Sequence, residues 1–234
     1  MISNKNLARV AGLLYLVVIA TGLFAEVFVR QAFRVSGDAL ATANNIQSAE
    51  MLFRWGIVAD LINLVCGLPC VLIIYSLFKQ VNKFLLQLAL TLVVIQTAII
   101  AVNLLNQISP LLILSSSSSY LNTFQPNQLA TLSQLSLNIQ VQGYAIGLVF
   151  FGFYCLLVGY VIYKSLLVPK FLGILYIISG LGYLINSFTM FLSKDFANPI
   201  FEYVAIPIFI GEFSFCLWLV IKGVNDSKIF NPNE

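Results

Sequence analysis

Six long apolar runs constrain this sequence more than any other feature. Each is close to the roughly 20 residues that an α-helix needs to cross the hydrocarbon core of a bilayer. Backbone polar groups find no water inside a bilayer, so apolar segments of this length cross it as helices. We therefore predict an all-α, six-helix transmembrane bundle that forms a single membrane domain over residues 1–234, with spans at about 8–29, 54–78, 84–106, 139–163, 170–192 and 199–221.

The composition excludes most other classes of protein. Hydrophobic residues make up 60% of the chain and charged residues 9%, whereas soluble domains have about 45–50% apolar and about 25% charged residues. The formal net charge of +3 is small, and the basic residues lie at the ends of spans rather than on one face. We therefore exclude a water-soluble enzyme, a disordered chain and a nucleic-acid-binding protein.

Histidine and cysteine usage limits the chemistry. The chain has no histidine, which removes the commonest metal ligand and general base. All four cysteines lie inside apolar runs. Cys66 and Cys70 are one helical turn apart, a spacing that allows a redox or metal pair, but we interpret them as packing residues because free cysteine is usually buried. We expect no metal and no cofactor.

The distribution of lysine and arginine predicts the orientation in the membrane. Cytoplasmic connections of membrane proteins are enriched in these residues. Eight lie on the side that holds both termini and four lie on the other side, so we predict cytoplasmic N- and C-termini. The eight are Lys5, Arg9, Lys79, Lys83, Lys164, Lys170, Lys222 and Lys228, and the four are Arg30, Arg34, Arg54 and Lys194.

Two short amphipathic helices are predicted on the external side. Asp38 is suited to cap a helix with Ala43 and Ile46 on its apolar side. Pro126 is suited to the first turn of a second helix, whose apolar side carries Leu129. We expect both helices to lie on the membrane interface or to cover the bundle.

Polar side chains within the predicted spans form the candidate site. A charge at the centre of a membrane helix costs about 2.5–3.5 kcal/mol, and such residues are usually functional. Counted from the external side, most of them lie in the outer half of their spans, with Glu212 slightly deeper. If these faces turn inward, they form a polar cavity that is open to the outside and closed toward the cytoplasm. The candidate ligand-binding residues are Glu26, Arg30, Arg54, Asp60, Asn103, Gln140, Gln142, Tyr144, Asn186 and Glu212.

The charges of this set do not balance. The carboxylates of Glu26, Asp60 and Glu212 face the guanidinium groups of Arg30 and Arg54, which leaves one carboxylate in surplus. We expect Glu212 to be protonated because of desolvation or to be paired with a bound cation. The alternative interpretation is a buried polar knot that fixes the register of the helices and binds nothing.

Several stretches of the sequence carry a family resemblance. They are ARVAGLLY (8–15), FAEVFVR (24–30), GDA (37–39), ATANNI (41–46), LFR (52–54), DL (60–61), GYAIGLVFFG (143–152), GE (211–212) and LWLVIKG (217–223). With them the chain resembles the bacterial membrane family named domain of unknown function 4386. The resemblance implies an integral protein of the bacterial plasma membrane, and it implies no activity.

Three classes of function remain open. The first, which we favour, is the binding or transport of a small molecule in the polar cavity, and a carrier of only six spans would have to act as a homodimer. The second is an intramembrane enzyme that modifies a lipid, although no Gly-rich phosphate loop or paired carboxylate motif is present. The third is a non-catalytic partner or sensor subunit. Its external loops would bind another membrane protein or a lipid. The expected surroundings are the lipid bilayer, and the expected ligand of the first two classes is a small molecule or a lipid.

Overall fold

Helices make up almost all of the computed structural model, which describes residues 3–115, 121 and 123–225. The elements are α1 (Asn4–Leu23), which continues into the π-helix η1 (Phe24–Gln31), α2 (Ala39–Ser48), α3 (Glu50–Phe78), α4 (Lys83–Ile113), α5 (Pro126–Lys164), α6 (Lys170–Leu192) and α7 (Lys194–Ile221). Within the described residues six segments are long and apolar enough to cross a membrane. The predicted all-α, multi-pass membrane bundle is therefore confirmed.

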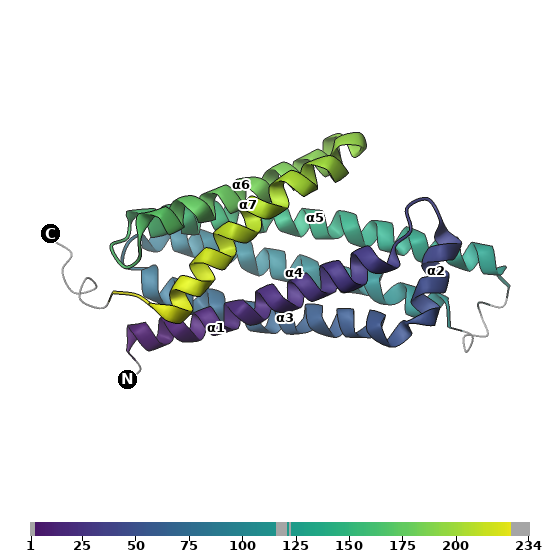
Figure 1. Ribbon diagram of the computed structural model, residues 1–234, viewed down its shortest axis with the longest axis horizontal. Helices are drawn as coiled ribbons and strands as arrows, with labels where there is room; N and C mark the ends of the chain where they lie inside the picture. Colours follow the sequence, from purple (N-terminus) through teal and green to yellow (C-terminus); the bar gives the residue numbers. More distant parts are fainter. Residues whose placement is uncertain (1–2, 116–120, 122, 226–234) are drawn as a thin grey trace.

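The long helices form a closed ring in the order α1, α3, α4, α5, α6 and α7, because each packs against the next and α7 packs against α1. Figure 1 shows them running along the long axis of the molecule, with the start of α1 and the end of α7 at the same end. We call this end the termini end. The opposite end, which holds α2, is called the α2 end.

The short helix α2 begins as the sequence predicts. The Asp38 carboxylate accepts a hydrogen bond of 2.8 Å from the backbone N–H of Ala41, which satisfies one of the free donors of the first turn. Ala43 and Ile46 are buried, and α2 packs against α3, α4 and α5. The amphipathic helix thus covers the α2 end of the bundle.

The second predicted external helix is not a separate element. Pro126 does occupy the first turn, but the helix continues without a break to Lys164 as α5. No glycine or proline stands between Asn127 and Gln142 to end it, and Ala130, Ser133 and Leu137 continue one buried face. Hydropathy marks only the apolar part of a membrane helix. It therefore predicts a span from about residue 139 and a separate short helix from Pro126, where the structure has the single helix α5.

Two apolar clusters enclose a layer of buried polar residues. This layer, which we call the polar layer, contains Arg30, Asp60, Asn103, Gln107 and Gln140. The larger one fills the half of the bundle near the termini end and includes Tyr15, Cys70, Phe78, Leu86, Tyr154, Tyr176 and Phe215. The smaller one lies under α2 and consists of Val29, Phe33, Ile46, Phe53, Ile57 and Leu137. Along α3, Asp60 lies between the two clusters, and Gln140 does so along α5. Asp60 and Gln140 therefore have apolar residues on both sides along their helices.

Candidate functional site

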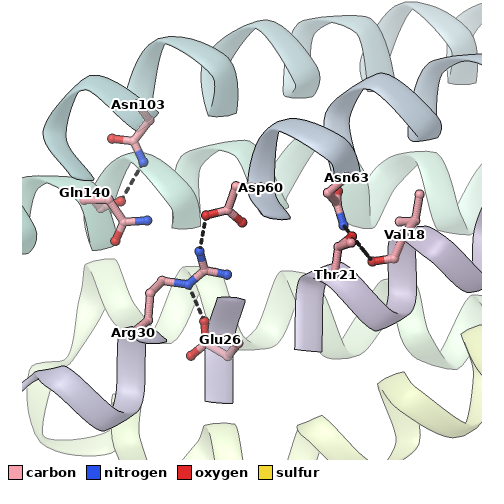
Figure 2. Close-up of polar contacts among 8 residues, drawn as sticks. All are labelled: Val18, Thr21, Glu26, Arg30, Asp60, Asn63, Asn103 and Gln140. Atoms are coloured by element: carbon pink, nitrogen blue, oxygen red, sulfur yellow. Dashed lines mark hydrogen bonds and ion pairs between the residues drawn. The ribbon is translucent and has the colours of Figure 1, made fainter. Parts of the chain in front are cut away.

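The centre of the polar layer is an ion triad of Glu26, Arg30 and Asp60. Nε of Arg30 donates a hydrogen bond of 2.7 Å to Oε2 of Glu26, and Nη1 donates one of 2.8 Å to Oδ2 of Asp60. The Arg30 side chain is 9% exposed, that of Asp60 is 7% exposed and that of Glu26 is 35% exposed. Figure 2 shows the guanidinium group between the two carboxylates. The structure thus joins three of the predicted residues across η1 and α3.

Local geometry explains why Arg30 reaches Asp60. Glu26 and Arg30 both lie on η1, an eight-residue π-helix, and π-helical turns are rare and occur frequently at functional sites. A Cβ atom on Gly56 would lie 2.7 Å from Cγ1 of Val29. Because Gly56 lacks a side chain, η1 approaches α3 closely, and Asp60 lies one turn further on the same face of α3.

Arg54 does not belong to this site. Its guanidinium group pairs with Glu50 one turn away, at 2.6 Å, and both side chains are 51% exposed. Arg34 lies closer to the triad, where its charge interacts with Glu26 and Arg30. Burial and the neighbouring Arg30 lower the pKa of Arg34, while Glu26 raises it. The second cation near the triad is therefore Arg34, which sequence reasoning placed among the external residues only.

Amide side chains from α4 and α5 extend the polar layer. Nδ2 of Asn103 donates a hydrogen bond of 2.7 Å to the backbone carbonyl oxygen of Gln140, and Asn106 donates one of 3.0 Å to Oδ1 of Asn103. Asn103 and Gln140 are both buried and lie on the α4 and α5 side of the triad in Figure 2. Tyr144 completes this wall, with its ring centroid 5.0 Å from Cζ of Arg30.

Gln142 points elsewhere. It is exposed on α5, because residues two positions apart on an α-helix face different sides, whereas Gln140 and Tyr144 share a face. Asn186 of α6 is buried at 6% exposure, and its Oδ1 has no hydrogen-bond partner among the described residues.

Sequence reasoning missed Gln107. Its side chain is 1% exposed and lies beside the Asp60 carboxylate. Neither Nε2 nor Oε1 has a partner within the strict geometric limits of a hydrogen bond among the described residues, although the amide is near enough to the Asp60 carboxylate to interact with it. Gln107 lies one turn from Asn103 on the same face of α4, and this spacing could have identified it. It was overlooked because the predicted span ended at residue 106, whereas α4 continues to Ile113.

Glu212 forms a second group nearer the termini end. Tyr183 donates a hydrogen bond of 3.1 Å to Oε1 of Glu212, and Tyr15 is another neighbour of this carboxyl group. The hydroxyl groups of Tyr15 and Tyr176 are 3.1 Å apart. Tyr144, which contacts Arg30, lies within electrostatic range of Glu212 as well.

The arrangement is suited to ion pairing and hydrogen bonding. Near the triad, Arg30 pairs with both Glu26 and Asp60, and Arg34 adds a second positive charge nearby while its own hydrogen bond goes to Oδ1 of Asn138. Glu212 makes no ion pair among the described residues, so the surplus carboxylate expected from the sequence is located there. In the described part of the chain no three His, Cys, Asp or Glu side chains gather as they would around a metal ion.

Comparisons with known proteins give a family but no activity. A family model described as "Domain of unknown function (DUF4386)" matches residues 10–223. A relative from Archaeoglobus fulgidus, described as "Uncharacterized protein", is 39% identical over 84 residues, which are 36% of this chain and 48% of the relative. The match thus spans about half the length of that relative. No solved structure matches the chain.

Proposed function

The chain belongs to the DUF4386 family, and from that premise and its own structure we propose that it binds a small polar molecule in the polar layer beside α2. The site consists of Glu26, Arg30, Asp60, Gln107 and Tyr144. Transport of the bound molecule is the further step of this proposal.

The buried amide of Gln107, which has no partner in strict hydrogen-bond geometry among the described residues, carries the proposal. Buried polar atoms in proteins nearly always have a hydrogen-bond partner, and an exception calls for an unseen water, ion or ligand. The amide presents one acceptor and one pair of donors next to the Arg30–Asp60 pair. A molecule that offers both a donor and an acceptor would satisfy it, which favours a polar ligand over an acyl chain.

The apolar residues that cover the two sides of the site differ in extent, and this favours ligand entry from the α2 end. The apolar core near the termini end is larger than the cluster under α2, so the shorter route passes by α2. We propose that the termini face the cytoplasm of a bacterial cell and that α2 faces outward, because Lys5, Arg9, Lys79, Lys83, Lys164, Lys170 and Lys222 lie toward the termini end. Lys228 lies outside the described residues. Ligand entry then requires displacement of α2.

Transport adds two requirements. The apolar core at the termini end must open, and Glu212, which lies between this core and the triad, would exchange a proton or a cation during the cycle. A bundle of six spans would carry out this rearrangement as a homodimer.

Native mass spectrometry of the full chain released from detergent tests the proposal. We expect a small-molecule adduct on the wild type that Gln107→Leu loses and that the control Gln142→Leu, on the exposed face of α5, retains. Equal adducts on all three proteins would place the ligand elsewhere. A bare wild-type chain, isolated gently from its native membrane, would contradict the proposal and support the buried polar knot. The same spectra distinguish monomer from dimer.

A further inference from the structure

A pocket lies at the termini end, away from the polar layer. It has a volume of about 420 Å³ and is lined by Lys5, Leu167, Trp218, Lys222, Gly223, Val224 and Asn225. It opens where α1 begins, where α5 connects to α6 and where α7 ends.

Hydrogen bonds hold the walls of this pocket in place. The backbone N–H groups of Lys222 and Gly223 both donate to the Trp218 carbonyl oxygen, at 2.9 and 3.0 Å. Gly223 has φ +71°, a left-handed conformation that glycine adopts without strain and that commonly ends a helix. The N–H of Asn225 then donates a bond of 3.0 Å to the carbonyl oxygen of Leu167, which ties the end of α7 to the α5–α6 connection.

Glycine also brings α1 against the end of α7. A Cβ atom on Gly223 would lie 2.9 Å from Cγ of Lys5 and 3.0 Å from its carbonyl oxygen. The close approach places the basic side chains of Lys5 and Lys222 at one pocket, although they are at opposite ends of the sequence.

The lining combines positive charge with apolar surface. Two lysines contribute charge, no Asp or Glu is among the seven lining residues, and both lysine side chains are exposed. Trp218 is of the type that lies at the level of lipid headgroups, and Leu167 and Val224 are buried in the adjoining core. Basic pockets between membrane helices bind the headgroups of anionic lipids.

We propose that this pocket binds the phosphate group of an anionic phospholipid, with Lys5 and Lys222 on the phosphate and Trp218 at the level of the glycerol. The site is independent of the polar layer near α2. A free phosphate ion shares the recognised chemistry, so the test includes it separately.

The full chain in detergent is titrated with phosphatidylglycerol, with phosphatidylcholine and with inorganic phosphate, and bound lipid is counted by native mass spectrometry. We expect phosphatidylglycerol to bind in preference to phosphatidylcholine, and the preference to fall by about fivefold for each lysine replaced in Lys5→Gln and Lys222→Gln. The matched control is Lys79→Gln with Lys83→Gln, which removes equal charge at the same end of the bundle.

The comparison between the pocket lysines and the control lysines separates a specific lipid site from a general effect of charge. Retention of the lipid preference in the control, but not in the double variant that combines Lys5→Gln with Lys222→Gln, supports the site. Equal losses in both double variants would overturn it, because they would indicate a general effect of surface charge, and so would absence of any preference in the wild type. Protection of the wild type against thermal unfolding by inorganic phosphate alone, without a lipid preference, would assign the pocket to a soluble phosphate and overturn the lipid proposal.

Discussion

Arg30 and Asp60 connect the π-helical segment to α3, with Nη1 of the guanidinium group 2.8 Å from Oδ2 of the carboxylate. Both side chains are more than nine-tenths buried. Two charges in such a place are tolerated only as a pair, because removing one leaves the other without compensation in a medium of low polarity. The pair therefore constrains how η1 and α3 pack.

Replacing the arginine should be much more costly than replacing an exposed one. We expect Arg30→Gln to lower the free energy of unfolding by about 3–5 kcal/mol, because Asp60 and Glu26 lose their shared cation. Arg54→Gln is the matched control, since its pair with Glu50 is half exposed and should contribute at most about 1 kcal/mol. Denaturant unfolding of the purified protein in detergent measures both, and equal losses would contradict the role of the triad.

The site of Gln107 predicts an unusual combination of effects. In the ligand-free protein, Gln107→Leu should raise the free energy of unfolding by about 1–3 kcal/mol, because it removes a buried amide that finds no well-aligned partner in the described part of the chain. With ligand present, the wild type should become more stable than Gln107→Leu, since only the wild type gains the binding free energy. Thermal unfolding before and after removal of bound small molecules measures both. A destabilised ligand-free variant would mean that water satisfies the amide.

Much of the architecture could be predicted from the sequence. The apolar runs identify all six spans, and Asp38 identifies the start of α2. The limits of the helices could not be predicted equally well, because a helix continues past its apolar part wherever no residue breaks it. For this reason the sequence predicts the first turns of α5 as a separate helix. For the same reason the predicted span ends before the last turns of α4, which hold Gln107.

Within the site, the level of a residue along its helix could be predicted better than the side of the helix that its side chain faces. The positions of Glu26, Arg30 and Asp60 along their helices were enough to expect them at one level. Arg54 and Asp60 both lie in the first half of α3. They are six residues apart, however, so their side chains leave the helix on different sides. The π-helix has no pattern that sequence reasoning recognised, and it sets the direction in which Arg30 points.

Gly143 controls the contact between α4 and α5. A Cβ atom at this position would meet the side-chain amide of Asn103, with Cγ only 2.6 Å away. We expect Gly143→Ala to displace Asn103 from the Gln140 carbonyl oxygen and to destabilise the protein by about 1–3 kcal/mol. Gly67→Ala in α3 is the control, because the added Cβ would meet no atom within 4 Å apart from its chain neighbours and the adjoining backbone of its own helix. The higher helix propensity of alanine should make this variant neutral or slightly stabilised. Similar losses for both would exclude the steric explanation.

Glu212 should tolerate replacement by its amide. The oxygen of a glutamine side chain can still accept the hydrogen bond from Tyr183, so Glu212→Gln should change the free energy of unfolding by no more than about 1 kcal/mol if the carboxyl group is neutral. Thermal unfolding in buffers with different monovalent cations measures this. A loss as large as that of Arg30→Gln, together with dependence on one cation in the wild type, would show instead that Glu212 is ionised and binds that cation.

The orientation of the bundle can be tested with single added cysteines. Three of the native cysteines are buried and Cys66 is half-buried within α3, so the wild type should react little with a membrane-impermeant maleimide. Asn44 on α2 and Gln80 in the α3–α4 connection are both exposed, and they lie at opposite ends of the bundle. With cytoplasmic termini, Asn44→Cys should be labelled in intact cells, whereas Gln80→Cys should be labelled only after permeabilisation. The reverse pattern would place α2 in the cytoplasm, and the polar layer would then receive its ligand from inside the cell.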